Sequence, residues 1–196
     1  MAKGPRYRTP YRRRRQKKTD YAARRTLATS EHPRFVVRIS NKTIQVQVTK
    51  SEMVGDFVLV KASSHELKEK HGWIASGKNM PAAYLIGYLV GKKAKAAGYE
   101  YANLDVGLKR VTSGNKIFAV VQGANDAGFE VPFDSDIAPS PEAISGKVIA
   151  DYAKNIEDPF EYERRFSVYL RRGLRPEALP SHFEKVKKHI EENNDE

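Results

Sequence analysis

Hydrophobic and polar residues alternate in short stretches of the chain that begin after residue 33. An apolar residue occupies every second position at Phe35, Val37 and Ile39, and again at Ile44, Val46 and Val48. A period of two is typical of strands with one buried and one polar face. The alternation places Arg34, Val36, Arg38 and Ser40 together on the outer face of the first strand. Ser40-Asn41-Lys42 predicts a hairpin turn between the two strands, and residues 57–60 predict a third strand.

A helical period follows. Apolar residues at Ala82, Leu85, Ile86, Leu89 and Val90 predict a helix from about residue 81 to residue 97. Gly87 and Gly91 lie one turn apart within it and indicate a close approach to a sheet. Residues 101–106 predict a strand, residues 107–114 a loop and residues 115–127 a second helix. This order predicts an α/β fold: a single domain with a mixed, largely antiparallel sheet and helices on one face. The other sheet face is then free to be polar.

The C-terminal third has a different texture. Six of the ten prolines lie between residues 132 and 180, and helical pieces are expected at about 142–156, 160–172 and 182–192. We divide the chain into an arm (1–32), an α/β core (33–132) and a Pro-hinged helical extension (133–196). The extension is expected to wrap over another surface through its apolar side chains: Phe160, Phe166, Tyr169, Leu170, Phe183 and Ile190.

Net charge is concentrated at the N-terminus. The first 38 residues hold 13 Lys and Arg against Asp20 and Glu31, which equals the whole net charge of +11. A basic arm on a neutral body favours a polyanionic partner. Arginine pairs bidentately with phosphate and stacks on bases, and the interleaved Tyr7, Tyr11 and Tyr21 add stacking faces. RNA is therefore favoured; the alternatives are a solubilising tail or a localisation signal. Residues 1–18 contain no Leu, Phe or Trp. They therefore lack the apolar helix face that binds a membrane surface.

The sequence lacks the residues or spacings that several kinds of functional site and targeting segment require. The chain has no cysteine, which excludes disulfides and thiolate sites and suits a reducing compartment. His65-Glu66 and His71 lack the spacing of a zinc helix, because Glu69 stands where the second histidine is needed. No apolar run reaches the length of about 20 residues that spans a bilayer, and the N-terminus has no secretory signal. We expect a cytoplasmic protein that is not an enzyme, with no metal, cofactor or small-molecule substrate.

Two further places suit RNA. Arg34 and Arg38, beside the arm, extend it into one basic surface, for which the alternative is an ordinary solvated sheet face. The segment 107–116 lacks the spacing of a phosphate-binding loop. Its Lys109 and Arg110, before a helix N-terminus, still suit an RNA phosphate, although a solvent loop is an equal alternative.

The order of motifs resembles one family through nearly the whole chain. The matching stretches are Gly4-Pro5-Arg6-Tyr7, residues 12–15, residues 33–38, Ser40-Asn41-Lys42 with residues 45–48, residues 77–85, residues 104–108 and residues 124–128. They resemble the large-subunit ribosomal protein family uL18 in its long archaeal form. The resemblance implies a small α/β domain that binds 5S ribosomal RNA through the arm and first hairpin in the central protuberance. It also implies contacts with large-subunit ribosomal RNA and neighbouring ribosomal proteins.

The residues and the resemblance together define the candidate RNA-binding set. Its members are Arg6, Tyr7, Arg8, Tyr11, Arg12, Arg13, Arg14, Arg15, Lys17, Lys18, Tyr21, Arg24, Arg25, Arg34, Arg38, Ser40, Asn41, Lys42, Gln45, Lys109 and Arg110. Two other classes remain as alternatives: a non-ribosomal RNA-binding module, and an enzyme acting on nucleic acid. Copurification of an RNA of 5S size at about one copy per protein would favour the ribosomal class, and metal- or nucleotide-dependent turnover would favour an enzyme.

Overall fold

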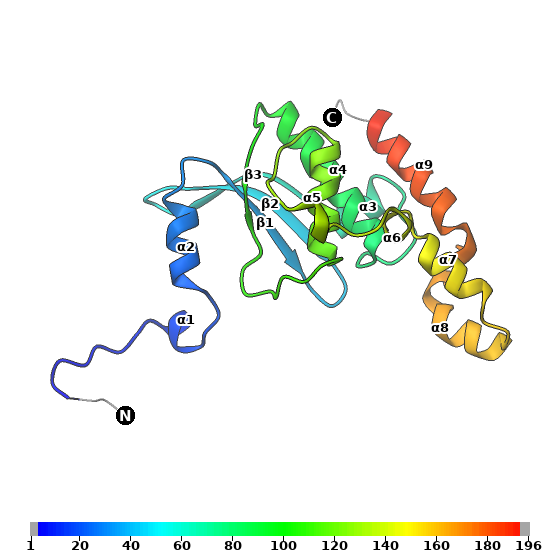
Figure 1. The fold of residues 1–196 in the computed structure, drawn as a ribbon, viewed down its shortest axis with the longest axis horizontal. Helices are drawn as coiled ribbons and strands as arrows, with labels where there is room; N and C mark the ends of the chain where they lie inside the picture. The colour runs from blue at the N-terminus through cyan, green and yellow to red at the C-terminus, as the bar shows by residue number, and fades with distance from the viewer. Residues whose placement is uncertain (1–3, 193–196) are drawn as a thin grey trace.

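A four-stranded sheet forms the centre of the molecule in a computed structural model that describes residues 4–192 (Figure 1). Its strands are β1 (Arg34–Ile39), β2 (Ile44–Ser51), β3 (Asp56–Ser63) and β4 (Asn103–Asp105). The order is β3-β2-β1-β4, with antiparallel pairs except for the parallel pair β1–β4. This confirms the mixed, largely antiparallel sheet. β3 is longer than the expected residues 57–60. β4 is shorter than the expected residues 101–106, because Tyr101 makes only an isolated bridge with Glu130.

The alternation of the sequence sets the register of the first hairpin. Ile39 lies opposite Ile44 and Phe35 opposite Val48, so the apolar residues of both strands share the buried face. The turn is closed by a hydrogen bond from the Ser40 amide to the Thr43 carbonyl at 2.8 Å. Because the strand period is two, this register fixes which side chains of β1 face away from the core.

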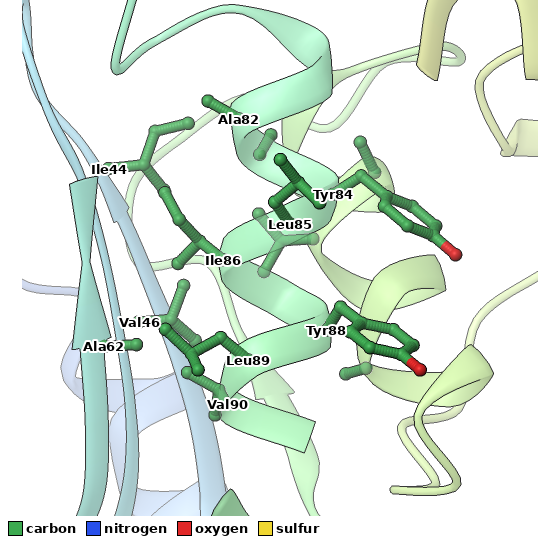
Figure 2. Packing of buried hydrophobic residues seen from close by; sticks show 14 of the residues in the cluster. Ile44, Val46, Ala62, Ala82, Tyr84, Leu85, Ile86, Tyr88, Leu89 and Val90 are labelled. Atoms are coloured by element: carbon green, nitrogen blue, oxygen red, sulfur yellow. The ribbon is translucent and has the colours of Figure 1, made fainter. Parts of the chain in front are cut away.

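Helix α4 (Met80–Ala96) packs on the apolar face of the sheet against β2 and β3, and α5 (Lys116–Asp126) packs on α4. The short α3 (Ser64–Glu69) follows β3. The Asn79 side chain caps α4 by accepting from the Ala82 amide at 2.9 Å. Figure 2 shows Ile86, Leu89 and Val90 directed towards the sheet, whereas Tyr84 and Tyr88 project from the other side of α4. The helix is therefore buried on its sheet-facing side and on other sides as well.

The glycines of α4 serve a contact between helices. A Cβ at Gly87 would lie 1.9 Å from the Val120 carbonyl oxygen, and one at Gly91 2.8 Å from the Ala124 carbonyl oxygen, both in α5. From the other side, a Cβ at Gly123 would lie 2.2 Å from the Tyr84 carbonyl oxygen. The expectation that Gly87 and Gly91 approach a sheet is therefore wrong. They let two helix backbones cross at close range, which any side chain there would prevent.

The extension is a chain of short helices. They are α6 (Pro141–Ser145), α7 (Lys147–Lys154), α8 (Pro159–Arg171) and α9 (Leu179–Glu192). The single helix expected at about 142–156 is interrupted at Gly146, which has a φ of +84° and would place a Cβ 2.8 Å from the Leu179 side chain. Gly146 thus ends α6 in the left-handed conformation that favours glycine, and the Leu179 side chain leaves no room for a Cβ there.

The extension packs on the core of its own chain. Phe183 of α9 is 4% exposed, and its ring lies 5.6 Å from that of Tyr84. The Tyr88 hydroxyl donates to Glu191 at 3.1 Å, and Ile190 and Phe166 are also buried. The expectation that these apolar residues need a foreign surface is therefore wrong for Phe183, Ile190 and Phe166. The second face of α4 is the surface that α9 covers.

Truncating the buried aromatic of α9 should destabilise the whole domain. We expect Phe183→Ala to lower the free energy of unfolding by about 3 kcal/mol, because it leaves a cavity between α9 and α4. Phe160→Ala is the matched control: Phe160 is 74% exposed on α8, and its truncation should change stability by less than about 0.5 kcal/mol. Urea denaturation of both variants measures the difference. Equal losses would show that α9 is not part of the core.

Candidate nucleic-acid interface

The N-terminal arm extends from one end of the molecule, opposite the helices of the extension (Figure 1). It contains α1 (Arg12–Arg15) and α2 (Tyr21–Ala28). All four arginines of α1 are exposed, and no acidic residue accompanies them. Like charges packed into one turn repel each other, so this segment suits a partner that neutralises them. Tyr11, 86% exposed beside α1, is free to stack on a base.

The rest of the expected arm residues are exposed as well. They are Arg6, Tyr7, Arg8, Lys17, Tyr21, Arg24 and Arg25. Lys18 is also exposed, next to Thr19, whose half-buried hydroxyl accepts from the Arg13 guanidinium at 2.9 Å.

Helix α2 is fastened to the sheet by a carboxylate. Asp20 caps its first turn by accepting from the amides of Ala22 and Ala23. Further along, Arg24 pairs with Asp56 at the start of β3, at 2.8 Å. The Asn103 amide group donates to the Ser30 hydroxyl at 2.7 Å just after the helix. The arm therefore approaches the polar face of the sheet at a fixed place.

Arg34 is buried rather than solvated. Its side chain is 4% exposed, with Nη1 3.0 Å from Asp105 Oδ2 and Nη2 2.9 Å from Asp56 Oδ2. The prediction that Arg34 extends the basic surface of the arm, and its alternative of a solvated sheet face, both require an exposed side chain, which Arg34 lacks. The strand alternation was right about the face, but two carboxylates enclose the guanidinium there. Its charge is paired inside the protein, and its role is to join β1 to the start of β3 and the end of β4.

Asp56 is a shared acceptor with a depressed pKa. Burial alone would raise the pKa of this carboxyl group, but hydrogen bonds from Arg24, Ser51 and Arg34 outweigh burial and lower it to about 2. Because the folded pKa lies below the ordinary value of 3.8, the ionised carboxylate stabilises the fold above that ordinary value. This stabilisation is lost as the pH falls through about 2.

Acid should therefore remove the contribution of Asp56. We expect wild type to be more stable than Asp56→Asn at about pH 5 and the difference to close as the pH approaches 2. Chemical denaturation at a series of pH values measures it, and Lys154→Gln, a surface ion-pair residue, serves as the control with a small effect throughout. A gap between wild type and Asp56→Asn that stays constant with pH would contradict the paired carboxylate.

A cleft of about 550 Å³ lies between the arm, β1 and the loop after β4. Five basic residues line it against two acidic ones, Asp20 and Asp105, and its apolar lining includes Leu27 and Leu104. The basic residues are Arg13, Lys18, Arg24, Arg38 and Lys109. Side chains from three separate segments thus bring their positive charges to one concavity. An anion bound there would meet several cations at once, in surroundings partly shielded from water.

The remaining candidates lie outside the cleft. Asn41, Lys42 and Gln45 are exposed in or beside the β1–β2 turn. The Ser40 hydroxyl accepts from the Thr43 amide at 3.0 Å and so shapes the turn. Arg110 is exposed in the loop before α5. Because these residues are exposed, the hairpin turn and the loop before α5 are accessible to a large partner outside the cleft.

Sequence reasoning missed the two acidic residues that organise this face. Asp105 accepts from Arg34, from Arg38 and from the Gly107 amide, and Asp56 accepts from Arg24. Their partners are mostly distant in the chain, so no local pattern identifies them. The one available signal for Asp105 was an aspartate directly after an apolar strand residue.

Residues of the zinc-like segment make an ion pair and a histidine–histidine contact with other parts of the chain. Glu66 of α3 pairs with Lys93 of α4 at 2.5 Å, and His71 lies 3.4 Å from His189, nitrogen to nitrogen. Residues 4–192 contain no group of three or more His, Cys, Asp or Glu side chains placed to hold a metal. Among the same residues, no helix has both the length and the apolar character to cross a membrane.

Known proteins resemble this chain over nearly its whole length. A family model described as "Ribosomal large subunit proteins 60S L5, and 50S L18" matches residues 5–100 and 92–134. The large ribosomal subunit protein uL18 of Ignicoccus hospitalis is 49% identical over 195 residues, covering 98% of this chain and 95% of the relative. Those of Caldivirga maquilingensis, 49% identical and covering 98% and 94%, and Desulfurococcus amylolyticus, 48% identical and covering 97% of each, are similar.

Proposed function

Because this chain belongs to the uL18 family of large ribosomal subunit proteins, we propose that it binds 5S ribosomal RNA and attaches it to the large subunit in the central protuberance. The family, in its archaeal form, makes the chain a structural constituent of the large subunit and not an enzyme. In this proposal the arm and the first hairpin contact 5S RNA, and other faces contact large-subunit ribosomal RNA and neighbouring ribosomal proteins.

The observation that carries the proposal is an exposed run of arginines in α1, next to the helix α2 that is fastened to the sheet. The net charge of the chain resides in its first 38 residues, and α1 presents four exposed arginines in one turn. Phosphate contacts by arginine and lysine provide much of the affinity of nucleic-acid binding. Anchoring α2 through Arg24 and Asp56 lets those arginines act together with the cleft and the hairpin turn.

The proposed division of labour follows from this arrangement. The arm (1–32) supplies phosphate contacts and the core (33–132) positions them. The extension (133–196) supports the core through α9 and presents α7 and α8 to other subunit components. Residues 1–3 and 193–196 lie outside the described residues. Val148, Tyr152, Phe160 and Val168 are exposed on α7 and α8, and we propose this side of the extension for contacts with neighbouring proteins or RNA.

A binding experiment with purified full-length protein tests the proposal. We expect tight, one-to-one binding to archaeal 5S ribosomal RNA that outcompetes a transfer RNA and a scrambled RNA of 5S length, as measured by gel shift in the presence of competitor. A non-ribosomal RNA-binding module would bind the three RNAs alike. Incorporation of the labelled protein into reconstituted large subunits, dependent on 5S RNA, is the second readout, and its absence would contradict the attachment role.

A further inference from the structure

The guanidinium of Arg38 is held on two of its three edges. Nη1 donates to the Val37 carbonyl at 2.9 Å and to the Asp105 carbonyl at 2.7 Å. Nη2 donates to Asp105 Oδ1 at 2.8 Å. An arginine has five N–H donors in a rigid planar fork, so three of them are used. The remaining two are the Nε donor and the second Nη2 donor, which lie parallel on the third edge.

The same guanidinium rests against Gly107. This glycine has a φ of +64°, and its amide donates to Asp105 Oδ1 at 2.9 Å. A Cβ at this position would lie 3.2 Å from Arg38 Cζ and 3.3 Å from Nη2. A side chain at position 107 would therefore press on the guanidinium and shift it by a few tenths of an ångström. Asp105 and Gly107 together form a cradle that fixes where Arg38 points.

From this geometry we infer that Asp105 and Gly107 are positioning residues that turn Arg38 into a one-edged fork for a single backbone phosphate of RNA. The free edge, Nε and Nη2, has the spacing that pairs with two oxygens of a phosphate. Within residues 4–192, no group accepts a hydrogen bond from Nε of Arg38, because its bonds all come from Nη1 and Nη2. The Arg38 side chain is 46% exposed, so a large partner has access to it.

The surroundings favour a phosphate over another ligand. Arg38 lines the cleft of about 550 Å³ together with Arg13, Lys18, Arg24 and Lys109. Of the two arginines on this face of β1, Arg34 is neutralised within the protein and its unpaired Nε is buried. Arg38 combines unpaired donors with an exposed side chain. This inference rests on the proposed function, since the phosphate is that of the bound RNA, but it makes a separate claim about geometry.

The test compares charge with fork geometry at one position. The full-length protein is titrated with archaeal 5S ribosomal RNA as wild type, Arg38→Ala and Arg38→Lys. Removing a charge-assisted bidentate contact should weaken binding by about 10-fold or more. Lysine keeps the charge but has no planar fork, so we expect Arg38→Lys to lose most of that affinity. Arg38→Lys within twofold of wild type, or Arg38→Ala without effect, would overturn the inference.

A second variant tests the cradle without touching the arginine. Gly107→Ala should weaken RNA binding by about fivefold, because the methyl group shifts the guanidinium and misaligns its fork with the phosphate oxygens. Gly98→Ala is the matched control: Gly98 also has a positive φ, of +81°, but has open space around a Cβ, so it shares the backbone strain alone. Asp105 is not substituted, because it also holds the buried Arg34. Equal effects of Gly107→Ala and Gly98→Ala would overturn the cradle.

The nature of the ligand is tested through the RNA. Archaeal 5S RNA carrying phosphorothioates should show a position that weakens binding to wild type but not to Arg38→Ala. RNA made with 7-deazaguanosine tests whether the fork reads a guanine edge instead, and a loss that depends on Arg38 there would overturn the phosphate assignment. If wild type itself fails to prefer 5S RNA, the proposed function fails. If wild type prefers 5S RNA and the variants match it, only the fork fails.

Discussion

Replacing Gly87 by alanine should destabilise the protein by at least about 4 kcal/mol, among the largest effects of a single methyl group. The new Cβ would lie 1.9 Å from the Val120 carbonyl oxygen, so α4 and α5 must separate by about 1 Å. A gap of that size forfeits up to about half of the dispersion energy across the interface. Because α4 packs more extensively on α5 than on any other element of the fold, the destabilisation extends over the whole interface.

The sign of this effect separates packing from helix propensity. Alanine is favoured over glycine by about 1 kcal/mol in a helix interior, so propensity alone predicts stabilisation. Ala96→Gly, at the exposed end of the same helix, is the control and should cost at most about 1 kcal/mol. Thermal and urea unfolding measure both variants. A Gly87→Ala protein as stable as wild type would show that the helices do not cross at this distance.

Deleting residues 1–18 should weaken 5S RNA binding by about 100-fold or more at physiological salt. The deletion removes nine cationic side chains: Lys3, Arg6, Arg8, Arg12, Arg13, Arg14, Arg15, Lys17 and Lys18. For every phosphate that the shortened protein no longer neutralises, the dependence of log affinity on log salt should flatten by roughly 0.7 to 0.9. Filter binding between low and physiological salt measures the slope.

A charge-conserving variant shows whether the arm acts through charge count or arginine chemistry. Substituting lysine at positions 12–15 leaves the number of cations unchanged, so the salt slope should stay close to that of wild type. The affinity should fall to a smaller extent than in the deletion, because lysine lacks the bidentate fork. Circular dichroism should show an intact fold in both, since α1 buries no residue. An unchanged salt slope after deletion would rule out the arm as the source of phosphate contacts.

Local sequence patterns predicted the strands and helices of this fold better than they predicted which parts of the chain pack against each of them. Alternation identified β1 and β2 and the orientation of Arg34, because a strand period of two depends only on neighbouring residues. It could not show that Arg34 is buried, since its partner Asp105 lies 71 residues away. In the same way, the Gly87–Gly91 spacing indicated a close approach, but only the arrangement of the helices shows that α5 is what approaches.

The candidate site likewise has a part that the sequence identifies, the arm, and parts that only the structure shows, the cleft and the cradle. The arm could be recognised from sequence because charge and composition are local properties, and its exposed arginines need no partner to be identified. The cleft could not be, because Arg13, Arg38 and Lys109 come from three separate segments. The Asp105–Gly107 cradle was missed because an acidic residue on a surface proposed to bind RNA contradicts simple charge matching. Its contacts with Arg38 are visible only in the folded structure.

The position of α9 has a consequence for how the chain is made. The helix that covers Tyr84 and Tyr88 is synthesised after every other helix of residues 4–192, and the Tyr88–Glu191 hydrogen bond spans 103 residues. Chains fold from the N-terminus during synthesis at about 5 to 20 residues per second. The second face of α4 therefore stays bare for several seconds while the extension is translated. During that interval the nascent chain exposes the apolar surface that α9 later buries, and such exposed surface makes a partly folded chain prone to aggregation.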